Sequence, residues 1–289
     1  MKRHLVLLLA ALLLTACAPS PSSGEFDARR EITVISREAG SGTRGAFTEL
    51  TGVQEKTEDR TIDRTTLEAG IANSTGVVMG GVANDRYAIG YISLGSLGGS
   101  VKPLALDGAA PTAENVRGGS YTLARPFILV TNGAPTGLAG DFIDFILSAE
   151  GQGVLEGRGY ISAVPEAPAF AGSLPGGTIV ISGSTSVAPG VEQLAEAYRA
   201  LNPGAHIEVH SQGSTAGIHA AIEGIADIGM SSRELNESEL AQLNRIVIAI
   251  DGLVLIVNNA NPLDGLSTEE ARDIFTGEIT RWSQLIIDN

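Results

Sequence analysis

Three short segments combine glycine with serine and threonine in a pattern that suits the binding of an oxyanion. Each follows a run of strand-forming residues and precedes a sequence compatible with a helix. A helix N-terminus leaves backbone N–H groups unpaired and carries a partial positive charge, and glycine lets an anion approach that backbone closely. Serine and threonine hydroxyls add hydrogen-bond donors without adding charge. The segments are residues 35–43 (ISREAGSGT), 181–186 (ISGSTS) and 211–217 (SQGSTAG).

Each segment alone is compatible with an ordinary helix start, because serine and threonine are common N-cap residues and glycine is common in turns. Three of them in one chain, one of which carries Arg37, favour a shared tetrahedral oxyanion. The guanidinium of Arg37 offers a planar fork that suits two oxygens of such an anion. The alternative role for Arg37 is an ion pair, with Glu38 as its partner. We expect Arg44 and Arg233 to pair with nearby carboxylates.

Short β-rich runs alternate with helical patterns along the chain, which predicts an α/β architecture. Helical spacing is clearest in residues 142–146 and 191–201, and residues 267–270 form a capping box that predicts a helix start. Residues 165–177, which are rich in proline and glycine, have the composition of a linker. The predicted strands cover residues 32–36, 88–92, 126–131, 178–182, 206–209, 226–230 and 247–257.

These segments resemble the phosphate-binding proteins of bacterial phosphate ABC transporters, which have the type II periplasmic-binding-protein fold. The most specific piece is Arg-x-x-Gly-Ser-Gly-Thr at residues 37–43, and further similarity lies in residues 73–76, 88–91, 182–189, 213–217, 227–233, 251–252 and 275–282. The resemblance implies an α/β fold of two lobes with two hinge crossover strands, and phosphate bound between the lobes without turnover. The residues that it implies as phosphate ligands are Arg37, Ser41, Gly42, Thr43, Ser184, Thr185, Ser186, Ser214, Ser231 and Ser232.

The order of these segments departs from the family. The part that is similar to the family's first half, residues 178–282, follows the part that is similar to its second half, residues 32–163. We therefore expect a circular permutation, in which residues 165–177 join the family's usual termini. Lobe A is expected to be continuous over residues 123–252, and lobe B to be assembled from residues 31–122 and 253–289. The alternative is a gene fragment that spans the junction of a tandem duplication.

Two positions depart from the pattern of some family members, which have an aspartate at the place of Ser232 and another at the place of Ala39. The aspartate at the place of Ser232 accepts the proton of the phosphate. The Ser232 hydroxyl can accept as well as donate a hydrogen bond. We therefore expect phosphate to bind, but with weaker discrimination against sulfate than in members that have the aspartate.

The first residues have the plan of a secretory signal peptide: Lys2 and Arg3, an apolar run, and small residues before Cys17, which is the only cysteine. The segment around Cys17 resembles a bacterial lipobox. We expect residues 1–16 to be a signal peptide, Cys17 to be lipidated and residues 17–30 to form a flexible tether. The expected location is the extracytoplasmic side of the cell envelope, and the alternative is an ordinary or uncleaved export segment.

The formal net charge of −14 argues against nucleic acid as a partner, because the chain would repel phosphate backbones. A hydrolase needs a general base or a metal ion, whereas the mature chain offers only His206, His210 and His219. We expect the first two on the surface. The expected partners are phosphate, the permease subunits of an ABC transporter and, through the lipid, the membrane, with no cofactor, no metal ion and a monomeric state. A receptor for sulfate or molybdate and a phosphate sensor without a transporter stay open.

Overall fold

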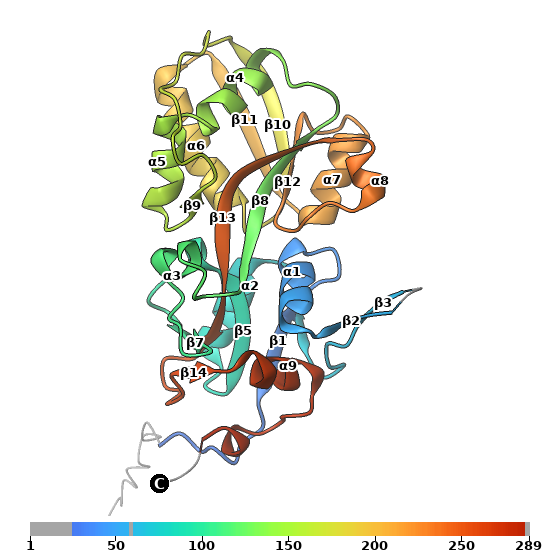
Figure 1. The fold of residues 1–289 in the computed structure, drawn as a ribbon, viewed down its shortest axis with the longest axis vertical. Coiled ribbons are helices and arrows are strands. Elements are labelled where there is room, and N and C mark those ends of the chain that lie inside the picture. The colour runs from blue at the N-terminus through green and yellow to red at the C-terminus, as the bar shows by residue number, and fades with distance from the viewer. Residues whose placement is uncertain (1–24, 58–59, 287–289) are drawn as a thin grey trace, which may run out of the picture.

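The computed structural model describes residues 25–57 and 60–286. Its elements form two lobes that are joined by two long antiparallel strands, β8 (Ala124–Thr131) and β13 (Asn244–Val257) (Figure 1). We call lobe A the one whose core includes Phe127 and Ala249, and lobe B the one whose core includes Leu123 and Leu253. The two strands therefore pass between the lobes at residues 124–126 and 250–252.

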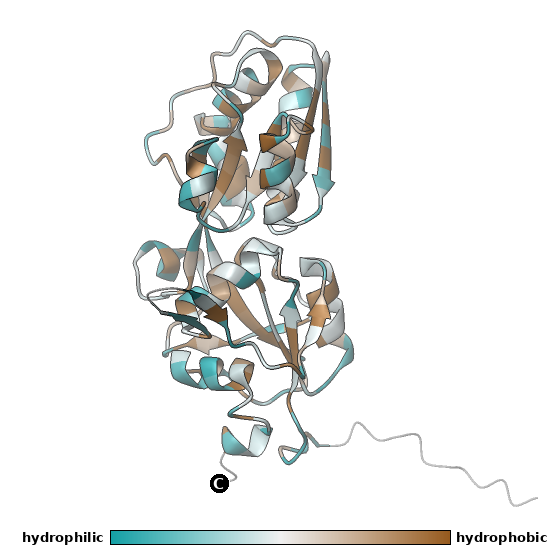
Figure 2. Cartoon of the chain, turned by 90° about the vertical axis from the view of Figure 1, so that its right-hand side faces the viewer, coloured by the Kyte–Doolittle hydropathy of each residue, from teal (hydrophilic) through white to brown (hydrophobic). Residues whose placement is uncertain are grey.

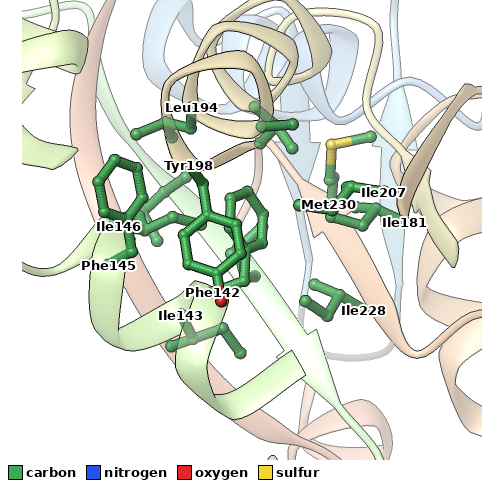
Figure 3. Packing of buried hydrophobic residues seen from close by; sticks show 14 of the residues in the cluster. Phe142, Ile143, Phe145, Ile146, Ile181, Leu194, Tyr198, Ile207, Ile228 and Met230 are labelled. Atoms are coloured by element: carbon green, nitrogen blue, oxygen red, sulfur yellow. The ribbon is translucent and has the colours of Figure 1, made fainter. Parts of the chain in front are cut away.

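Lobe A is a sheet covered by helices on both faces. The strand order is β11-β10-β12-β8-β13, in which β10 is parallel to β11 and β12, and β9 adds to β13. The helical spacing predicted for residues 142–146 and 191–201 is confirmed, because both segments are helical. Their side chains Phe142, Phe145, Leu194 and Tyr198 pack in one core (Figure 3). Its further elements are β9 (Ile161–Ser162), β10 (Gly177–Gly183), β11 (Ala205–Ser211), β12 (Ile228–Ser231), α4 (Gly137–Ile146), α5 (Ala149–Gly157), α6 (Ala188–Leu201), α7 (Ser214–Ile222) and α8 (Glu237–Leu240).

Lobe B combines segments from both ends of the chain. Its strands continue the sheet in the order β13-β5-β1-β4, and Phe275 and Trp282 from the C-terminal part share a core with Phe47 and Tyr91. Its elements are β1 (Thr33–Arg37), α1 (Gly42–Thr51), β2 (Gln54–Lys56), β3 (Thr61–Asp63), β4 (Gly70–Ala72), α2 (Thr75–Asn84), β5 (Ala88–Ser93), η1 (Leu94–Ser96), β6 (Lys102–Pro103), β7 (Ala105–Leu106), α3 (Ala113–Arg117), β14 (Gly265–Leu266), α9 (Thr268–Thr276) and η2 (Trp282–Gln284).

All seven predicted strands are present, and each end lies within three residues of its predicted place. The capping box is confirmed as well: the Ser267 hydroxyl accepts from the N–H of Glu270, and the Glu270 carboxylate accepts from the N–H of Ser267. In both lobes hydrophobic residues are concentrated in the strands of the sheet (Figure 2). No helix in the described ranges is long and apolar enough to cross a membrane.

The predicted linker is irregular in structure but firmly attached to lobe A. Between β9 and β10 the chain has no helix or strand, yet the Phe170 ring lies 5.4 Å from that of Phe145. The Asp141 carboxylate accepts from the N–H groups of Ser173, at 2.7 Å, and Leu174, at 3.3 Å. The segment is thus a strap that crosses the helices of lobe A.

The end of the predicted tether needs a correction. Residues 26–30 lie against lobe B, because the Phe26 ring packs 5.0 Å from Tyr87 and 5.9 Å from Trp282. The N–H of Ser283 also donates to the carbonyl of Ala28 at 2.6 Å. The aromatic contact outweighs the local composition that suggested a flexible segment. The predicted signal peptide, Cys17 and the first part of the tether lie outside the described residues.

Candidate functional site

The three glycine- and hydroxyl-rich segments meet where the two lobes face each other. The first follows β1 and starts α1, the second follows β10 and leads into α6, and the third follows β11 and starts α7. Because β1 belongs to lobe B and the other two strands belong to lobe A, the cluster is shared between the lobes. We call this set of side chains the hydroxyl cluster. Its members are Thr43, Thr75, Ser184, Thr185, Ser186, Ser214 and Ser232.

Direct contacts across the lobes hold the cluster together. The Oγ1 of Thr43 and the Oγ of Ser186 are 2.7 Å apart, and both side chains are buried. Close to them, a Cβ added at Gly42 would lie 2.3 Å from the Oγ of Ser214 and 2.8 Å from that of Ser232. Only a residue without a side chain fits at position 42, since such short distances are not compatible with van der Waals contact.

Within lobe A, three serines form a chain of hydrogen bonds. The Ser184 hydroxyl donates to the Ser232 hydroxyl at 2.9 Å, and the Ser214 and Ser232 hydroxyls are 3.3 Å apart. The Ser214 hydroxyl also accepts from the N–H of Ser232 at 3.1 Å. All three residues are at most 2% exposed, so these hydroxyls lie in a desolvated environment, where hydrogen bonds are electrostatically stronger than in water.

Thr75 belongs to the cluster although it was not among the ligands predicted from the sequence. It is the first residue of α2, and its Oγ1 lies 3.2 Å from the Oγ of Ser186 and 3.4 Å from the Oγ1 of Thr185. The residues around it, Asn73-Ser74-Thr75-Gly76, were among the segments that carried the family resemblance. The signal was therefore present, but a second hydroxyl beside the N-cap Ser74 is hard to separate from ordinary helix capping.

Arg37 lies at the edge of the cluster and is almost fully buried. Its Nε and Nη2 donate to the two carboxylate oxygens of Glu38 at 2.9 and 2.8 Å, and its Nη1 donates to Thr75 at 3.5 Å. The side chains of Arg37 and Glu38 are 2% and 27% exposed. The ion pair with Glu38 that was the alternative role expected for Arg37 is thus present, next to the hydroxyls and not on the open surface.

The remaining predicted ligands have local roles. The Ser41 hydroxyl caps α1 by accepting from the N–H of Arg44 at 3.3 Å. Thr185 reaches the cluster through Thr75. The Ser231 hydroxyl donates to the carbonyl of Arg233 at 2.9 Å and so closes a turn. All predicted ligands of lobe A except Ser231 thus belong to the hydroxyl cluster, whereas the Ser231 hydroxyl bonds the backbone.

The carboxylate partners expected for Arg44 and Arg233 are confirmed. Arg44 bonds Asp63 at 2.7 Å, and Arg233 forks onto Glu239 at 2.9 and 2.8 Å. Burial raises the pKa of Asp63, but hydrogen bonds from Arg44 and Thr65 outweigh it, so that the pKa is lower than usual. The Arg233 fork likewise holds the pKa of Glu239 below its usual value. Both arginines are therefore paired with carboxylates, as expected.

The histidines lie away from the hydroxyl cluster. The side chains of His206 and His210 are 66% and 50% exposed, which confirms that they lie on the surface. They flank Glu208 on β11. His219 is exposed on α7. Among the described residues no group of three His, Cys, Asp or Glu side chains could hold a metal ion. The cluster therefore has the donors for binding an anion, and none of the histidines stands beside it as a general base.

Comparisons with known proteins agree with this geometry. A family model described as "PBP superfamily domain" matches residues 23–150 and 168–289. "Phosphate-binding protein PstS 2" of Streptococcus agalactiae is 43% identical over 295 residues, which cover 99% of each chain. The crystal structure of a phosphate-binding protein of a phosphate ABC transporter from Streptococcus pneumoniae has a TM-score of 0.71 and 45% identity, and covers 89% of this chain and all of its own. "Phosphate-binding protein PstS" of Bacillus subtilis is 34% identical over 112 residues, 38% of this chain and 37% of its own.

Proposed function

The chain belongs to the PBP superfamily and to its phosphate-binding proteins, and we propose that it binds inorganic phosphate between its two lobes and delivers it to an ABC transporter. It is a binding protein and not an enzyme. The observation that carries the proposal is the hydroxyl cluster: seven buried or half-buried side chains from both lobes converge beside the buried Arg37. The relatives that match the whole chain are named phosphate-binding proteins.

The cluster can bind phosphate by exchanging partners. Thr43 and Ser186 now share one hydrogen bond across the lobes, at 2.7 Å. An oxyanion placed between them accepts from both hydroxyls and from the N–H groups at the starts of α1 and α7, which carry partial positive charge. Since hydroxyls can rotate, the same groups serve as donors to the anion and as partners for each other. Closure of the lobes desolvates the anion and strengthens each hydrogen bond to it.

Arg37 supplies the charge of the proposed site. Two of its nitrogens face Glu38, and the third faces Thr75 and the hydroxyl cluster. We propose that this Nη1 donates to phosphate, while Glu38 fixes the plane of the guanidinium. Of the ten ligands expected from the sequence, we keep all except Ser231, and we add Thr75.

Selectivity between phosphate and sulfate depends on an acceptor for the phosphate proton. The hydroxyl of Ser232 is neutral, and Glu38 uses both of its oxygens on Arg37. An ionised acceptor in the site would reject sulfate strongly, because its charge would face an unprotonated oxygen. We therefore propose that phosphate binds best and that sulfate is rejected only weakly.

The experiment that tests the function is calorimetric titration of residues 25–289 with phosphate, followed by competition with sulfate and molybdate. Saturable phosphate binding that sulfate displaces at higher concentration supports the proposal. Tight binding of sulfate or molybdate without phosphate binding would identify a receptor for another oxyanion. Absolute rejection of sulfate would show that an ionised acceptor faces the bound phosphate.

We further propose that the chain is a circular permutant with a mobile hinge. Lobe A would be residues 123–252 and lobe B residues 31–122 and 253–289, with β8 and β13 as crossover strands. Two sequence matches support this: the relative from S. agalactiae aligns over 99% of both chains, whereas the one from B. subtilis aligns over little more than a third. A sequence alignment that covers only one part of each chain is expected when the two halves of the proteins occur in opposite order.

Two variants test the permutation. Because the N–H of Ser283 bonds the carbonyl of Ala28, a short linker from residue 286 to residue 26 can join the present ends. We expect such a chain, opened within residues 165–176, to fold and to bind phosphate. Removal of residues 266–289 should abolish binding although every proposed ligand remains. Unchanged affinity after that removal would contradict the assignment of the C-terminal segment to lobe B.

The protein is extracytoplasmic, as a receptor for an ABC transporter must be, and we propose that a lipid on Cys17 holds it at the membrane. The support is the sequence before Cys17, which resembles a lipobox. A stable anchor needs two or more acyl chains, since one chain binds only marginally. Fractionation of cells tests this: the wild type is expected with the membranes, and Cys17→Ser is expected to be released or left unprocessed. Equal solubility of both would exclude the lipid anchor.

A further inference from the structure

Arg125 is a second buried arginine, on β8 at the point where the chain passes between the lobes. The side chains of Arg125 and Asp251 are 2% and 0% exposed. The Nε and Nη2 of Arg125 donate to one Asp251 oxygen at 3.2 and 3.1 Å. The other Asp251 oxygen accepts from the hydroxyl of Ser93 at 2.8 Å. This pair therefore links three strands, β8, β13 and β5, at the junction of the lobes.

The third nitrogen of the same guanidinium reaches the hydroxyl cluster. The Nη1 of Arg125 donates to the carbonyl of Ser232 at 3.2 Å. Ser214 accepts from the N–H of Ser232, and Ser184 donates to its hydroxyl. The backbone and side chain of Ser232 are thus held by three groups, of which Arg125 is the one that carries a charge. We therefore expect a change at Arg125 to move Ser232, the residue that affects selectivity between phosphate and sulfate.

Arg125 and Arg37 lie in one electrostatic environment. Burial lowers the pKa of Arg125, and the positive charge of Arg37 lowers it further, while Asp251 opposes both effects. Burial raises the pKa of Asp251, and Arg125 and the Ser93 hydroxyl oppose that rise. Charges interact strongly where water is excluded. The positive charge of Arg125 will therefore attract an anion that is bound beside Arg37. The negative charge of Asp251 weakens this attraction.

We propose that Arg125 is a positioning residue, which orients Ser232 for the bound anion, and that Asp251 limits how much of the Arg125 charge reaches that anion. The inference rests on the proposed function. It assigns two separate effects to the ion pair. The hydrogen bond from the Arg125 guanidinium holds Ser232 in place, and the balance between the charges of Arg125 and Asp251 sets the affinity for anions. A pair that served only to stabilise the fold would have neither effect on binding once the protein is folded.

The two effects predict changes of opposite sign. Asp251→Asn keeps the arginine but removes the compensating charge, so we expect it to tighten sulfate binding by about three- to tenfold through the added attraction. The same change lowers stability, because it leaves a buried guanidinium unpaired. Arg125→Lys keeps the charge but cannot serve Asp251 and Ser232 through one planar fork. We expect it to weaken phosphate binding by about tenfold or more, the effect of one lost charged hydrogen bond.

The experiment titrates wild type, Asp251→Asn and Arg125→Lys with phosphate and with sulfate by calorimetry, and records thermal unfolding of each. Residues 25–289 are used, since a solved relative that spans 89% of this chain is itself folded. Asp141→Asn is the matched control. Asp141 is a buried carboxylate of lobe A that bonds Tyr198 and the strap, away from the hydroxyl cluster. We expect this control to lower the unfolding temperature and to leave both affinities unchanged.

The outcomes separate the inference from the proposed function. If the wild type binds neither anion, the proposed function fails, and the inference fails with it. If the wild type binds phosphate while Asp251→Asn and Arg125→Lys lose only stability, as the control does, the inference alone is wrong. If Asp251→Asn does not fold, Arg125→Lys decides: wild-type phosphate affinity overturns the proposal, and weaker binding at an intact fold supports it.

Discussion

Gly42→Ala should abolish tight phosphate binding without weakening the fold of either lobe. The residue is the first of α1 in lobe B, and the side chains nearest to it are Ser214 and Ser232 of lobe A. A methyl group there would lie 2.3 Å from the Oγ of Ser214. Since non-bonded heavy atoms need about 3.5 Å, the lobes must stay apart by about a further 1 Å at this point.

The size of the effect follows from the contacts that this separation breaks. The Oγ atoms of Thr43 and Ser186, now 2.7 Å apart, would move beyond hydrogen-bond distance, and so would the N–H of Thr215 and the carbonyl of Gly40, now at 3.2 Å. Donors from the two lobes could then no longer reach one anion together. The loss of two or three such bonds costs about 2–4 kcal/mol, or about a 30- to 1000-fold weaker affinity.

Calorimetric titration with phosphate measures the affinity, and thermal unfolding without phosphate measures the stability. The unfolding temperature should stay the same or rise slightly, because alanine is favoured over glycine in a helix. Gly80→Ala is the control: this glycine lies in α2, and an added Cβ would meet no atom within 4 Å. Phosphate affinity of Gly42→Ala equal to that of Gly80→Ala would refute the idea that the lobes close on the anion in this arrangement.

Three further changes test other parts of the molecule. Arg37→Ala should weaken phosphate binding by about 2–5 kcal/mol, and Arg37→Lys should weaken it less, as titration will show; wild-type affinity of the alanine variant would exclude Arg37 as a ligand. The pKa of Glu239 is below its usual value of 4.5, so its ion pair with Arg233 stabilises the fold above that pH and is lost as the pH falls through the lower value. Glu239→Gln should therefore lower the free energy of unfolding by about 1.5–3 kcal/mol at pH 7, and by less at pH 3, in denaturant titrations; an equal difference at both values would contradict this reasoning. Trp282→Ala should cost about 3–5 kcal/mol in the same assay, because the side chain is fully buried and its Nε1 donates to the carbonyl of Tyr87 at 3.1 Å; a loss below about 1 kcal/mol would show that this segment is not part of the core.

The long strands of the sheet could be predicted from the sequence because they bury apolar residues over many positions. In β13, every residue from Ile248 to Val257 except Ile250 is buried, and such a run can be recognised without knowing its neighbours. The strands of two or three residues, such as β6 and β14, were missed, since they are too short to show alternation. Their existence depends on which longer strands pass beside them.

The proposed site was predicted in its parts but not in its pairings. Hydroxyl-rich helix starts are visible in the sequence, whereas the contact of Thr75 with Ser186 joins residues 111 positions apart. The fork of Arg37 onto Glu38 depends on backbone angles that composition does not determine. One pairing could have been predicted: Arg125 directly precedes the predicted strand 126–131, Asp251 lies in the predicted strand 247–257, and the two charges are of opposite sign. A buried charge in such a strand requires a partner.

The junction between the lobes also has a consequence for the order in which the chain folds. Ser93 and Asp251 are 158 residues apart in sequence, so joining β5 to β13 from the unfolded chain closes a very long loop. When Arg125 and Asp251 are already paired, 126 of those residues lie within lobe A. The loop that must still close to join Ser93 to Asp251 is then about fivefold shorter than in the unfolded chain. Each halving of loop length saves about 0.6 kcal/mol of closure entropy, so prior formation of lobe A lowers the barrier to lobe B by about 1.4 kcal/mol. We therefore expect lobe A to form before lobe B, and lobe B to stay unassembled until almost the whole chain has left the ribosome.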